Sequence, residues 1–382
     1  MNYGHLLSWV EVSRQALTDN VRRFKAHIGR EVRLAAVVKA NAYGHGLLEA
    51  SRVALEAGAD WLAVNSVDEA ALLRSAGVQA PAICLAYVPL SSLEDAVALG
   101  VRLTVFNSET VDLLGAITDR LKRVARLHIK VETGTNRQGV RGEELLQLAQ
   151  AVRRHPYLEL EGLSTHYANI EDVTEHRFAE HQLRNFIEAC SLLERSGILV
   201  PIKHTACTAA AILFPNTLFN LARVGIGLYG LWPSKETKIS ALQAGIALNE
   251  LEPVLSWKTR IAQIKTVPSG ATIGYGCTDL ATQETRIAVL PVGYYEGYDR
   301  RLSSIGYVLI RGRRAPVRGR VCMNMIMVDI TNIPDVKLED EAVLLGRQGE
   351  DSVSAETLAG KIGTINYEVV SRINPQLPRI VV

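Results

Sequence analysis

Short apolar runs alternate with longer segments of helical periodicity up to about residue 230. The runs, which we predict to be strands, lie at residues 33–39, 61–65, 82–86, 102–106, 126–131, 159–166, 202–205 and 221–230. Between them, segments such as 66–77 and 107–117 open with Ser66 and Asn107, favoured N-cap residues, and the first ends at Gly77, a favoured residue after a helix. Strands that are apolar almost throughout are buried on both faces, so the pattern predicts a parallel sheet covered by helices.

The number of strand–helix pairs favours one particular parallel architecture. Eight pairs over this length are typical of a (β/α)8 TIM barrel, in which the strands form a ring inside a shell of helices. A doubly wound open sheet is the alternative. Such sheets usually carry the turn GxGxxG after their first strand, whereas the first run here continues into VVKANAYGHG. We therefore expect an α/β fold built on a TIM barrel.

The pattern changes after about residue 245, where segments rich in β-branched residues are separated by turn sequences. The segments are 259–267, 285–293 and 306–312, and the turns are 268–272 and 313–320. They predict a mostly antiparallel β domain. We place the barrel at 1–240 and the β domain at 245–382, with the linker within 233–253.

Composition narrows the function classes. The chain has 382 residues, enough for two domains, and 42 basic residues nearly balance 40 acidic ones, for a net charge of +2. This balance, without basic runs, argues against nucleic acid and a membrane surface as partners. The first residues resemble neither a signal peptide nor a membrane span. Five scattered cysteines argue against disulfides and a metal site, and favour the cytoplasm.

Lys39 is the first candidate for chemistry, because it ends an otherwise apolar run. An amine there costs desolvation free energy unless something uses it. One interpretation is a lysine whose charged tip reaches solvent at the barrel rim. The other is a lysine that forms a Schiff base at the C-terminal end of a barrel strand, where active sites of this fold lie. Position alone favours neither.

The last two predicted strands carry candidates for phosphate binding. The glycines of LARVGIGLYG allow the backbone to approach an anion closely, and barrels often bind phosphate after strands seven and eight. In HTACTAA, Thr208 could donate its hydroxyl to the same phosphate, although an N-cap is the commoner role of such a threonine.

Lys39 and the candidates for phosphate binding support one interpretation when taken together, because the sequence resembles the alanine racemase family over essentially its whole length. The matching segments, in the family's order and spacing, are AAVVKANAYGHG, LHIKVETGTNRQG, GLSTHYAN, HTACTAA, ARVGIGLYG, IGYGCTD, VGYYEGY, GRVCMNM and INYEVVSRI. The first is very specific. The resemblance implies a barrel followed by a β domain, and an isomerase that interconverts L- and D-alanine with pyridoxal 5′-phosphate.

The resemblance also implies how the cofactor is held. Lys39 would be modified by an aldimine bond to pyridoxal phosphate, Arg223 would face the pyridine nitrogen, and His204 would hydrogen-bond Arg223. The phosphate ligands would be Tyr43, Thr208, Tyr367 and the amides of Gly225 and Ile226. Arg137 would reach the phenolic oxygen of the cofactor and the substrate carboxylate. Lys130, at the family's carbamylated position, would hold Arg137 in place.

Racemisation removes the α-proton from one face and returns a proton to the other, which two bases on opposite faces achieve. The resemblance assigns these bases to Lys39 and Tyr275, with His166 beside the cofactor orienting Tyr275. The backbone amide of Met323 would bind the substrate carboxylate. The entrance would be lined by Tyr294, Arg300 and Ile365. Taken singly, residues such as His166 could equally be satisfied core side chains.

Arg223 and Tyr275 distinguish the racemase interpretation from two alternatives. Many enzymes of this cofactor protonate the pyridine nitrogen through a carboxylate, whereas arginine keeps its proton and leaves that nitrogen an acceptor. The carbanion is then less delocalised, which suits a racemase that avoids side reactions. A basic amino-acid decarboxylase of similar architecture would place an acid there. A non-catalytic pyridoxal phosphate carrier would resemble the barrel alone and lack Tyr275.

The sequence departs from the family pattern near the substrate. Met323-Asn324-Met325 stands where Met-Asp-Gln is usual. Because related racemases that prefer serine can carry asparagine there, a serine/alanine racemase is the alternative function. The other departures are Cys207 for asparagine, Thr208 for serine, Gln138 for leucine and Glu132 for aspartate.

The resemblance implies, finally, an assembly and a role. A head-to-tail homodimer would let the partner chain supply Tyr275 and Met323, so that two-fold symmetry creates two shared active sites. The product D-alanine would serve as a peptidoglycan precursor.

Overall fold

The computed structural model describes residues 5–246, 248 and 251–382, which divide into two compact units. One unit consists of Gln15–Ala42 and the described residues of 50–252. The other combines the described residues up to Arg14 with Tyr43–Glu49 and Pro253–Val382. The chain thus passes between the units near its start as well as after the barrel. The division of the chain into a barrel at 1–240 and a β domain at 245–382 stays a prediction.

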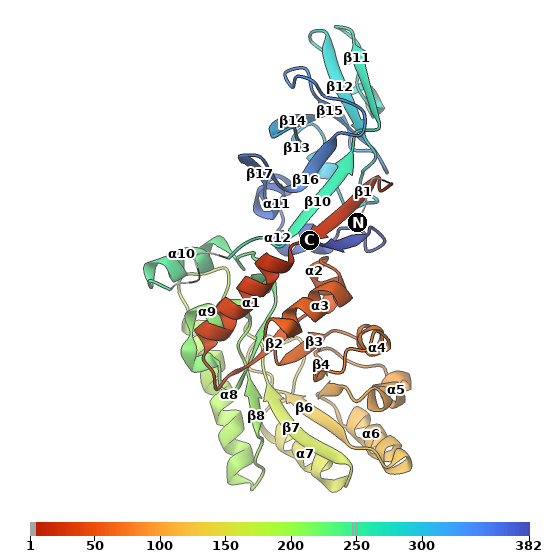
Figure 1. Ribbon diagram of the computed structural model, residues 1–382. Coiled ribbons are helices and arrows are strands. Elements are labelled where there is room, and N and C mark those ends of the chain that lie inside the picture. Colours follow the sequence, from red (N-terminus) through yellow and green to blue (C-terminus); the bar gives the residue numbers. More distant parts are fainter. Residues whose placement is uncertain (1–4, 247, 249–250) are drawn as a thin grey trace. The chain divides into compact units, whose positions relative to one another are not determined.

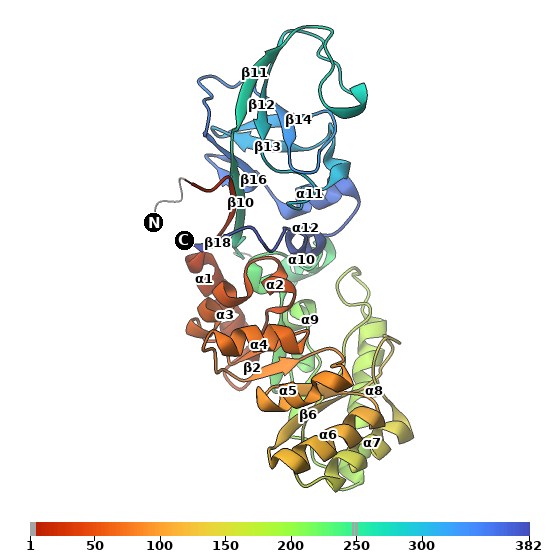
Figure 2. The same cartoon turned by 90° about the vertical axis from the view of Figure 1, so that its right-hand side faces the viewer.

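The first unit is a parallel barrel (Figures 1 and 2). Its strands are β2 (Arg33–Val37), β3 (Trp61–Val64), β4 (Ala82–Cys84), β5 (Arg102–Val105), β6 (Ala125–Lys130), β7 (Leu158–Ser164), β8 (Ile202–His204) and β9 (Leu221–Val224). They pair in the order β8-β7-β6-β5-β4-β3-β2-β9. At the seam between β8 and β9, the N–H groups of Asn220 and Arg223 donate to the carbonyls of Lys203 (3.5 Å) and Ala206 (3.0 Å), which nearly closes the ring.

Helices and short turns alternate with these strands. They are α1 (Arg14–Ile28), α2 (Lys39–Tyr43), α3 (Leu47–Glu56), α4 (Val67–Ser75), η1 (Leu90–Ser92), α5 (Leu93–Ala98), α6 (Ser108–Leu121), α7 (Gly142–Arg154), α8 (Arg177–Arg195), α9 (Thr208–Leu213), η2 (Pro215–Thr217), η3 (Ile226–Tyr229) and α10 (Lys235–Gln243). Two predicted helix starts are confirmed, since Ser66 accepts from the Glu69 amide (3.3 Å) and Asn107 from the Thr110 amide (2.9 Å). Gly77 follows α4 at φ +80°, as expected of a residue after a helix.

The second unit is a mostly antiparallel sheet with two small helices. Its elements are β1 (Ser8–Val12), β10 (Leu255–Arg260), β11 (Gln263–Val267), η4 (Tyr275–Cys277), β12 (Thr285–Leu290), η5 (Arg300–Leu302), β13 (Tyr307–Ile310), β14 (Arg313–Arg318), β15 (Ile326–Asp329), β16 (Glu341–Gln348), β17 (Asp351–Val353), α11 (Ala355–Ile362), α12 (Asn366–Ser371) and β18 (Arg379–Val381). β1 pairs antiparallel with β10 and parallel with β18, so the first strand of the chain belongs to this sheet. Along β10, buried Leu255, Trp257 and Thr259 alternate with less buried neighbours, the period of a strand with one buried face.

The predicted fold class, a TIM barrel followed by a mostly antiparallel β domain, is confirmed. Several predicted elements are wrong in extent; for example, segment 259–267 is split between the end of β10 at Arg260 and the start of β11 at Gln263. Run 33–39 is a strand only to Val37, because the chain then turns left-handed, and run 221–230 only to Val224, because it continues as η3. The predicted turn 313–320 contains β14. Pro316 lies opposite Tyr307 in a pair that needs no N–H from it, since the flanking bond is donated by Val317 to Gly306 (2.9 Å).

The expected linker at 233–253 is partly helical, because α10 occupies Lys235–Gln243 and is capped by Ser234, which accepts from the Thr237 amide (2.9 Å). Residues 247, 249 and 250 of that segment lie outside the described residues. Among the helices of residues 5–246, 248 and 251–382, none combines the length and the apolar character needed to cross a bilayer.

Candidate active site

Lys39 lies just past the C-terminal end of β2, at the start of an unusual turn. Ala40, Asn41, Ala42 and Tyr43 all have φ between +52° and +54°. Left-handed backbone costs about 1–2 kcal/mol per residue for residues other than glycine, so the surroundings must hold this turn. One anchor is Glu69 on α4, whose carboxylate accepts the N–H groups of Ala40 and Asn65, each at 2.7 Å. The residues after β2 and β3 are thereby tied together.

The barrel unit gathers several predicted site residues into one cationic cluster. Burial and the nearby Arg137 lower the pKa of Lys39, against the opposing charge of Glu69. Burial and the guanidinium groups of Arg223 and Arg137 hold the pKa of Lys130 well below its ordinary value. Burial and the charge of Lys130 hold the pKa of His166 well below its ordinary value, with further contributions from Arg223, Arg137 and Lys39. Such a cluster favours neutral amines and an anionic ligand.

Arg223 is the most firmly held member of this cluster. Its Nη1 donates to His204 Nδ1 (2.6 Å) and to the His204 carbonyl (2.8 Å). Its Nη2 donates to the carbonyls of Thr165 (2.8 Å) and Thr205 (3.0 Å). Among the described residues these contacts use four of the five guanidinium protons and leave the Nε–H group for a ligand. Burial lowers the pKa of Arg223 to about 10, so the side chain stays charged near neutral pH.

Two of the predicted phosphate ligands meet at the end of β9. The Gly225 N–H donates to the Thr208 hydroxyl at 3.0 Å, which leaves the hydroxyl proton of Thr208 for a ligand. The N-cap of α9 is Cys207 rather than Thr208, so the alternative role weighed for this threonine is wrong. At Gly227 an added Cβ would lie 2.6 Å from Phe24 and 2.7 Å from the Thr208 methyl group, so only glycine fits there. Ile226 begins η3 directly after Gly225.

Arg137 lies in a loop organised by Glu132. Although burial acts to raise it, hydrogen bonds from the amides of residues 134–137 hold the pKa of the Glu132 carboxyl below its usual value. The bond from the Gly134 amide is 2.5 Å long. The Arg137 side chain is exposed, and Gln138 beside it is half-buried. Glu132 therefore shapes the loop that carries Arg137.

His166 is positioned by its own backbone. Its carbonyl accepts from the hydroxyl of Thr135 (2.6 Å) and from the amide of Gln182 (3.1 Å). Thr135 belongs to the Glu132 loop, so His166 and Arg137 are fixed through the same segment.

The remaining predicted site residues belong to the β unit. The rings of Tyr43 and Tyr367 lie with their centroids 6.0 Å apart. Tyr275, in η4, is 72% exposed, and Met323 is 54% exposed. The predicted entrance residues Tyr294 and Ile365 are also exposed.

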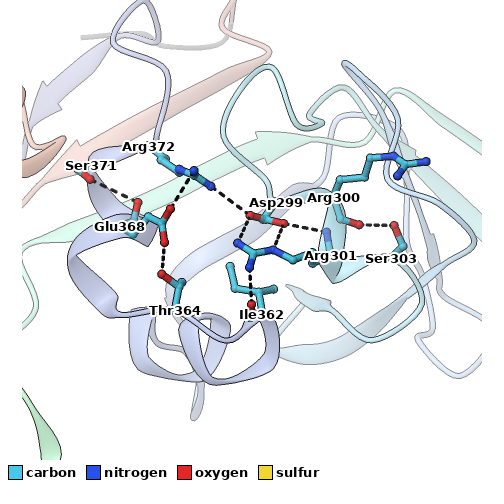
Figure 3. Close-up of polar contacts among 9 residues, drawn as sticks. All are labelled: Asp299, Arg300, Arg301, Ser303, Ile362, Thr364, Glu368, Ser371 and Arg372. Carbon is cyan, nitrogen blue, oxygen red and sulfur yellow. Dashed lines mark hydrogen bonds and ion pairs between the residues drawn. The ribbon is translucent and has the colours of Figure 1, made fainter.

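A polar network joins η5, which carries the predicted entrance residue Arg300, to α11 and α12 (Figure 3). Asp299 accepts from the amide (2.8 Å) and guanidinium (2.9 Å) of Arg301, and Arg301 donates to the Ile362 carbonyl (2.7 Å). Arg372 bridges Asp299 (3.4 Å) and Glu368 (2.8 Å). Because η5 carries Arg300, and α12 carries Tyr367 with Ile365 at its N-cap, the network fixes these residues relative to one another.

Asn324, the main departure from the family pattern, has a structural partner. Its side-chain amide donates to Glu296 Oε1 at 2.6 Å, and Glu296 Oε2 accepts the N–H of Gly293 at 2.7 Å. A carboxylate at position 324 would face the Glu296 carboxylate without a proton to share. The amide therefore suits this chain, whose Glu296 requires a donor.

Two family models match the chain and together span nearly all of it. The model of the alanine racemase N-terminal domain matches residues 12–233, and that of the alanine racemase C-terminal domain matches residues 254–381. The chain belongs to the alanine racemase family.

Individual members of the family align with the chain over almost their whole length. It is 39% identical to an alanine racemase of Leptospira interrogans over 98% of this chain and 96% of the relative. It is 41% identical to alanine racemase 2 of Bacillus subtilis over 97% and 93%. The crystal structure of alanine racemase from Bacillus anthracis with bound L-Ala-P superposes with a TM-score of 0.92, at 38% identity over 99% of this chain and 95% of that one.

Sequence reasoning missed several residues that organise the site. Glu69 stands three residues after Ser66, which is the pattern of a capping box, in which the glutamate bonds the N-cap amide. In the structure it bonds the Asn65 and Ala40 amides instead. His128 and Glu161, on β6 and β7, gave no signal, because they are far apart in the sequence and no motif links them.

Proposed function

We propose that this chain interconverts L- and D-alanine with pyridoxal 5′-phosphate as its cofactor. The observation that carries the proposal is the pairing of a lysine of lowered pKa, Lys39, with a charged arginine, Arg223, at the same end of the barrel. An acid in place of Arg223 would favour a decarboxylase, which argues against that alternative.

The side chains fit this cofactor. Its phosphate carries close to two negative charges, which the guanidinium groups of Arg137 and Arg223 can help to balance. Lys39 Nζ would hold the cofactor covalently, and Arg223 would face its pyridine nitrogen through Nε–H. The phosphate ligands would be Tyr43, Thr208, Tyr367 and the amides of Gly225 and Ile226. When bound, the cofactor supplies an electron sink that acidifies the α-proton of the substrate.

Two bases would move the proton. Lys39, whose amine has a lowered pKa, would serve one face of the substrate, and Tyr275, oriented by His166, the other. Arg137 and the backbone amide of Met323 would bind the substrate carboxylate. Because Arg223 stays charged, the pyridine nitrogen would remain unprotonated and the substrate carbanion short-lived, which limits side reactions.

The test of this function uses purified protein loaded with pyridoxal phosphate. We expect L-alanine to be converted to an equal mixture of enantiomers, followed by chiral chromatography over a panel of L-amino acids. Release of carbon dioxide without a D-enantiomer would instead identify a decarboxylase. Bound cofactor without any turnover would identify a carrier.

Lys130 is expected to act as a carbamate that orients Arg137. Its lowered pKa favours the neutral amine, which can add to carbon dioxide to give an N-carboxylate and a proton. Such an anion can accept two hydrogen bonds from a guanidinium. We expect Lys130→Ala to lower kcat/KM by about ten- to a hundred-fold, with partial rescue by added acetate or chloride. Mass spectrometry of the intact protein would check the modification. Full activity in the variant, or no rescue, would count against it.

Asn324 is expected to broaden substrate choice. With its N–H group engaged by Glu296, its carbonyl oxygen can accept a hydrogen bond from a serine hydroxyl. We expect detectable serine racemisation beside a dominant alanine activity, and a lower serine-to-alanine ratio of kcat/KM in Asn324→Asp. The double variant Asn324→Asp, Glu296→Gln restores a donor–acceptor pair and controls for simple repulsion. An unchanged ratio in both variants would reject this role.

Assembly and location follow the family. A head-to-tail homodimer would cover the exposed Tyr275 and Met323, and all five cysteines are unpaired, as in a reducing cytoplasm. D-alanine made there would supply peptidoglycan precursors.

A further inference from the structure

A line of buried polar side chains crosses the barrel behind Arg223. Arg223 Nη1 donates to His204 Nδ1 (2.6 Å), and His204 Nε2 lies 2.8 Å from His128 Nδ1. His128 Nε2 lies 2.8 Å from Glu161 Oε2. Arg102 donates to both oxygens of Glu161, at 2.6 and 3.0 Å. Both histidines are 0% exposed, so water does not interrupt the line.

The two ends of the line fix its direction. A guanidinium can only donate hydrogen bonds, and a carboxylate can only accept them. His204 must therefore accept from Arg223 at Nδ1 and carry its proton on Nε2, which donates to His128. For the same reason His128 carries its proton on Nε2 and donates to Glu161.

The charges around the line agree with this arrangement. Burial lowers the pKa of both histidines, and the Arg223 guanidinium adds to the effect on His204, so each ring is neutral with one proton. Although burial acts to raise it, hydrogen bonds from His128 and Arg102 hold the pKa of the Glu161 carboxyl below its usual value. The carboxylate is thus ionised near neutral pH.

The local fold is shaped to admit the line. A Cβ at Gly162 would lie 2.1 Å from His128 Nδ1, the atom that accepts from His204, so only glycine fits on β7 there. The pairing of β6 with β7 shifts register between Leu127 and His128. At the far end, the Arg102 guanidinium stacks 4.1 Å from the ring centre of Trp61. These features keep Glu161 and His128 in one arrangement.

We propose that His128 and Glu161 are positioning residues of the racemase, which act through His204 to hold Arg223 against the cofactor. The proposal rests on the proposed function, because Arg223 would affect the reaction only through the pyridine nitrogen. Because it can only accept, the Glu161 carboxylate prevents the hydrogen bonds of the line from reversing their donor–acceptor direction. A neutral donor at 161 would let both histidines move their protons to Nδ1, and His204 would then present an N–H to Arg223 and displace it.

The first test is Glu161→Gln, which keeps the shape and allows the reversal. We expect kcat to fall about ten- to a hundred-fold, the range seen when outer hydrogen-bond partners of a metal-binding histidine are removed, with KM changed less than about two-fold. The loss is partial because the carbonyls of Thr165, His204 and Thr205 still hold Arg223. The matched control is Glu159→Gln on the same strand. Glu159 pairs with Arg126 (3.1 Å), whose guanidinium also lies 3.7 Å from Glu161 Oε1, so this control removes a neighbouring charge and keeps every hydrogen bond of the line. Equal kinetics in the two variants would overturn the proposal.

The second test locates the protons and does not depend on a variant that folds. Neutron diffraction from deuterated crystals of the loaded wild-type enzyme should show deuterium on Nε2 of His128 and His204, and none on their Nδ1 atoms. Deuterium on Nδ1 of either ring would overturn the inference. If the wild type racemises alanine but the protons lie elsewhere, this inference alone fails. If the wild type has no racemase activity, the proposed function fails first.

Discussion

Replacing Lys39 by alanine is expected to remove the visible absorbance of the purified protein and nearly all of its racemase activity. Lys39 supplies the amine that would hold the cofactor and one of the two bases, so a single change removes two functions. Burial and Arg137 lower its pKa, which favours the neutral amine that both functions need. We expect turnover to fall by at least about four orders of magnitude, since general-base catalysis alone contributes 10²–10⁴-fold.

The matched control for this prediction is another lysine of the barrel. Lys203 on β8 pairs with Glu194 at 2.7 Å, away from the cationic cluster, so Lys203→Ala should keep both colour and activity. Spectra of both variants after gel filtration with pyridoxal phosphate, together with their melting temperatures, separate cofactor loss from unfolding. A coloured and active Lys39→Ala protein would remove the basis of the proposed chemistry.

The barrel could be predicted from sequence because its strands are mostly apolar runs and helices such as α4 and α6 begin at strong N-caps. What the sequence could not predict is where a strand stops. The run to Lys39 looks uniform, yet the strand ends at Val37 because four residues adopt left-handed backbone that Glu69 helps to hold. That constraint comes from a residue on α4 and leaves no mark in the run itself. Similarly, Pro316 predicts a turn from sequence, and only its pairing with Tyr307 shows that it lies in a strand.

The site was predictable only through the resemblance. A lysine, an arginine and two histidines at strand ends each have an ordinary explanation, and their joint occurrence in the family's order decides between them. The residues that position the site could not be predicted, because their hydrogen-bond partners are distant in the sequence. Glu161 on β7 accepts a hydrogen bond from His128 on β6. The sequence suggested only that an acid is lost at Asn324, whereas the structure shows that its amide donates to Glu296.

A site shared between two subunits is the second prediction with a large effect. Lys39 belongs to the barrel unit and Tyr275 to the β unit, and Tyr275 is 72% exposed in the single chain. We expect a partner chain to supply Tyr275. Two inactive variants, Lys39→Ala and Tyr275→Phe, should then regain activity when co-expressed. In a mixed dimer one site receives both defects and the other receives neither.

The size of the recovery follows from random mixing. Half of the dimers are mixed and each has one of two sites intact, so activity should return to roughly a quarter of wild type. If each chain instead builds its own site, every site carries one defect and nothing recovers. Differential affinity tags on the two variants allow the mixed dimer to be purified, where half of wild-type activity per dimer is expected. A mixed dimer without activity would reject the shared site, while the wild-type racemase assay would still decide the proposed function.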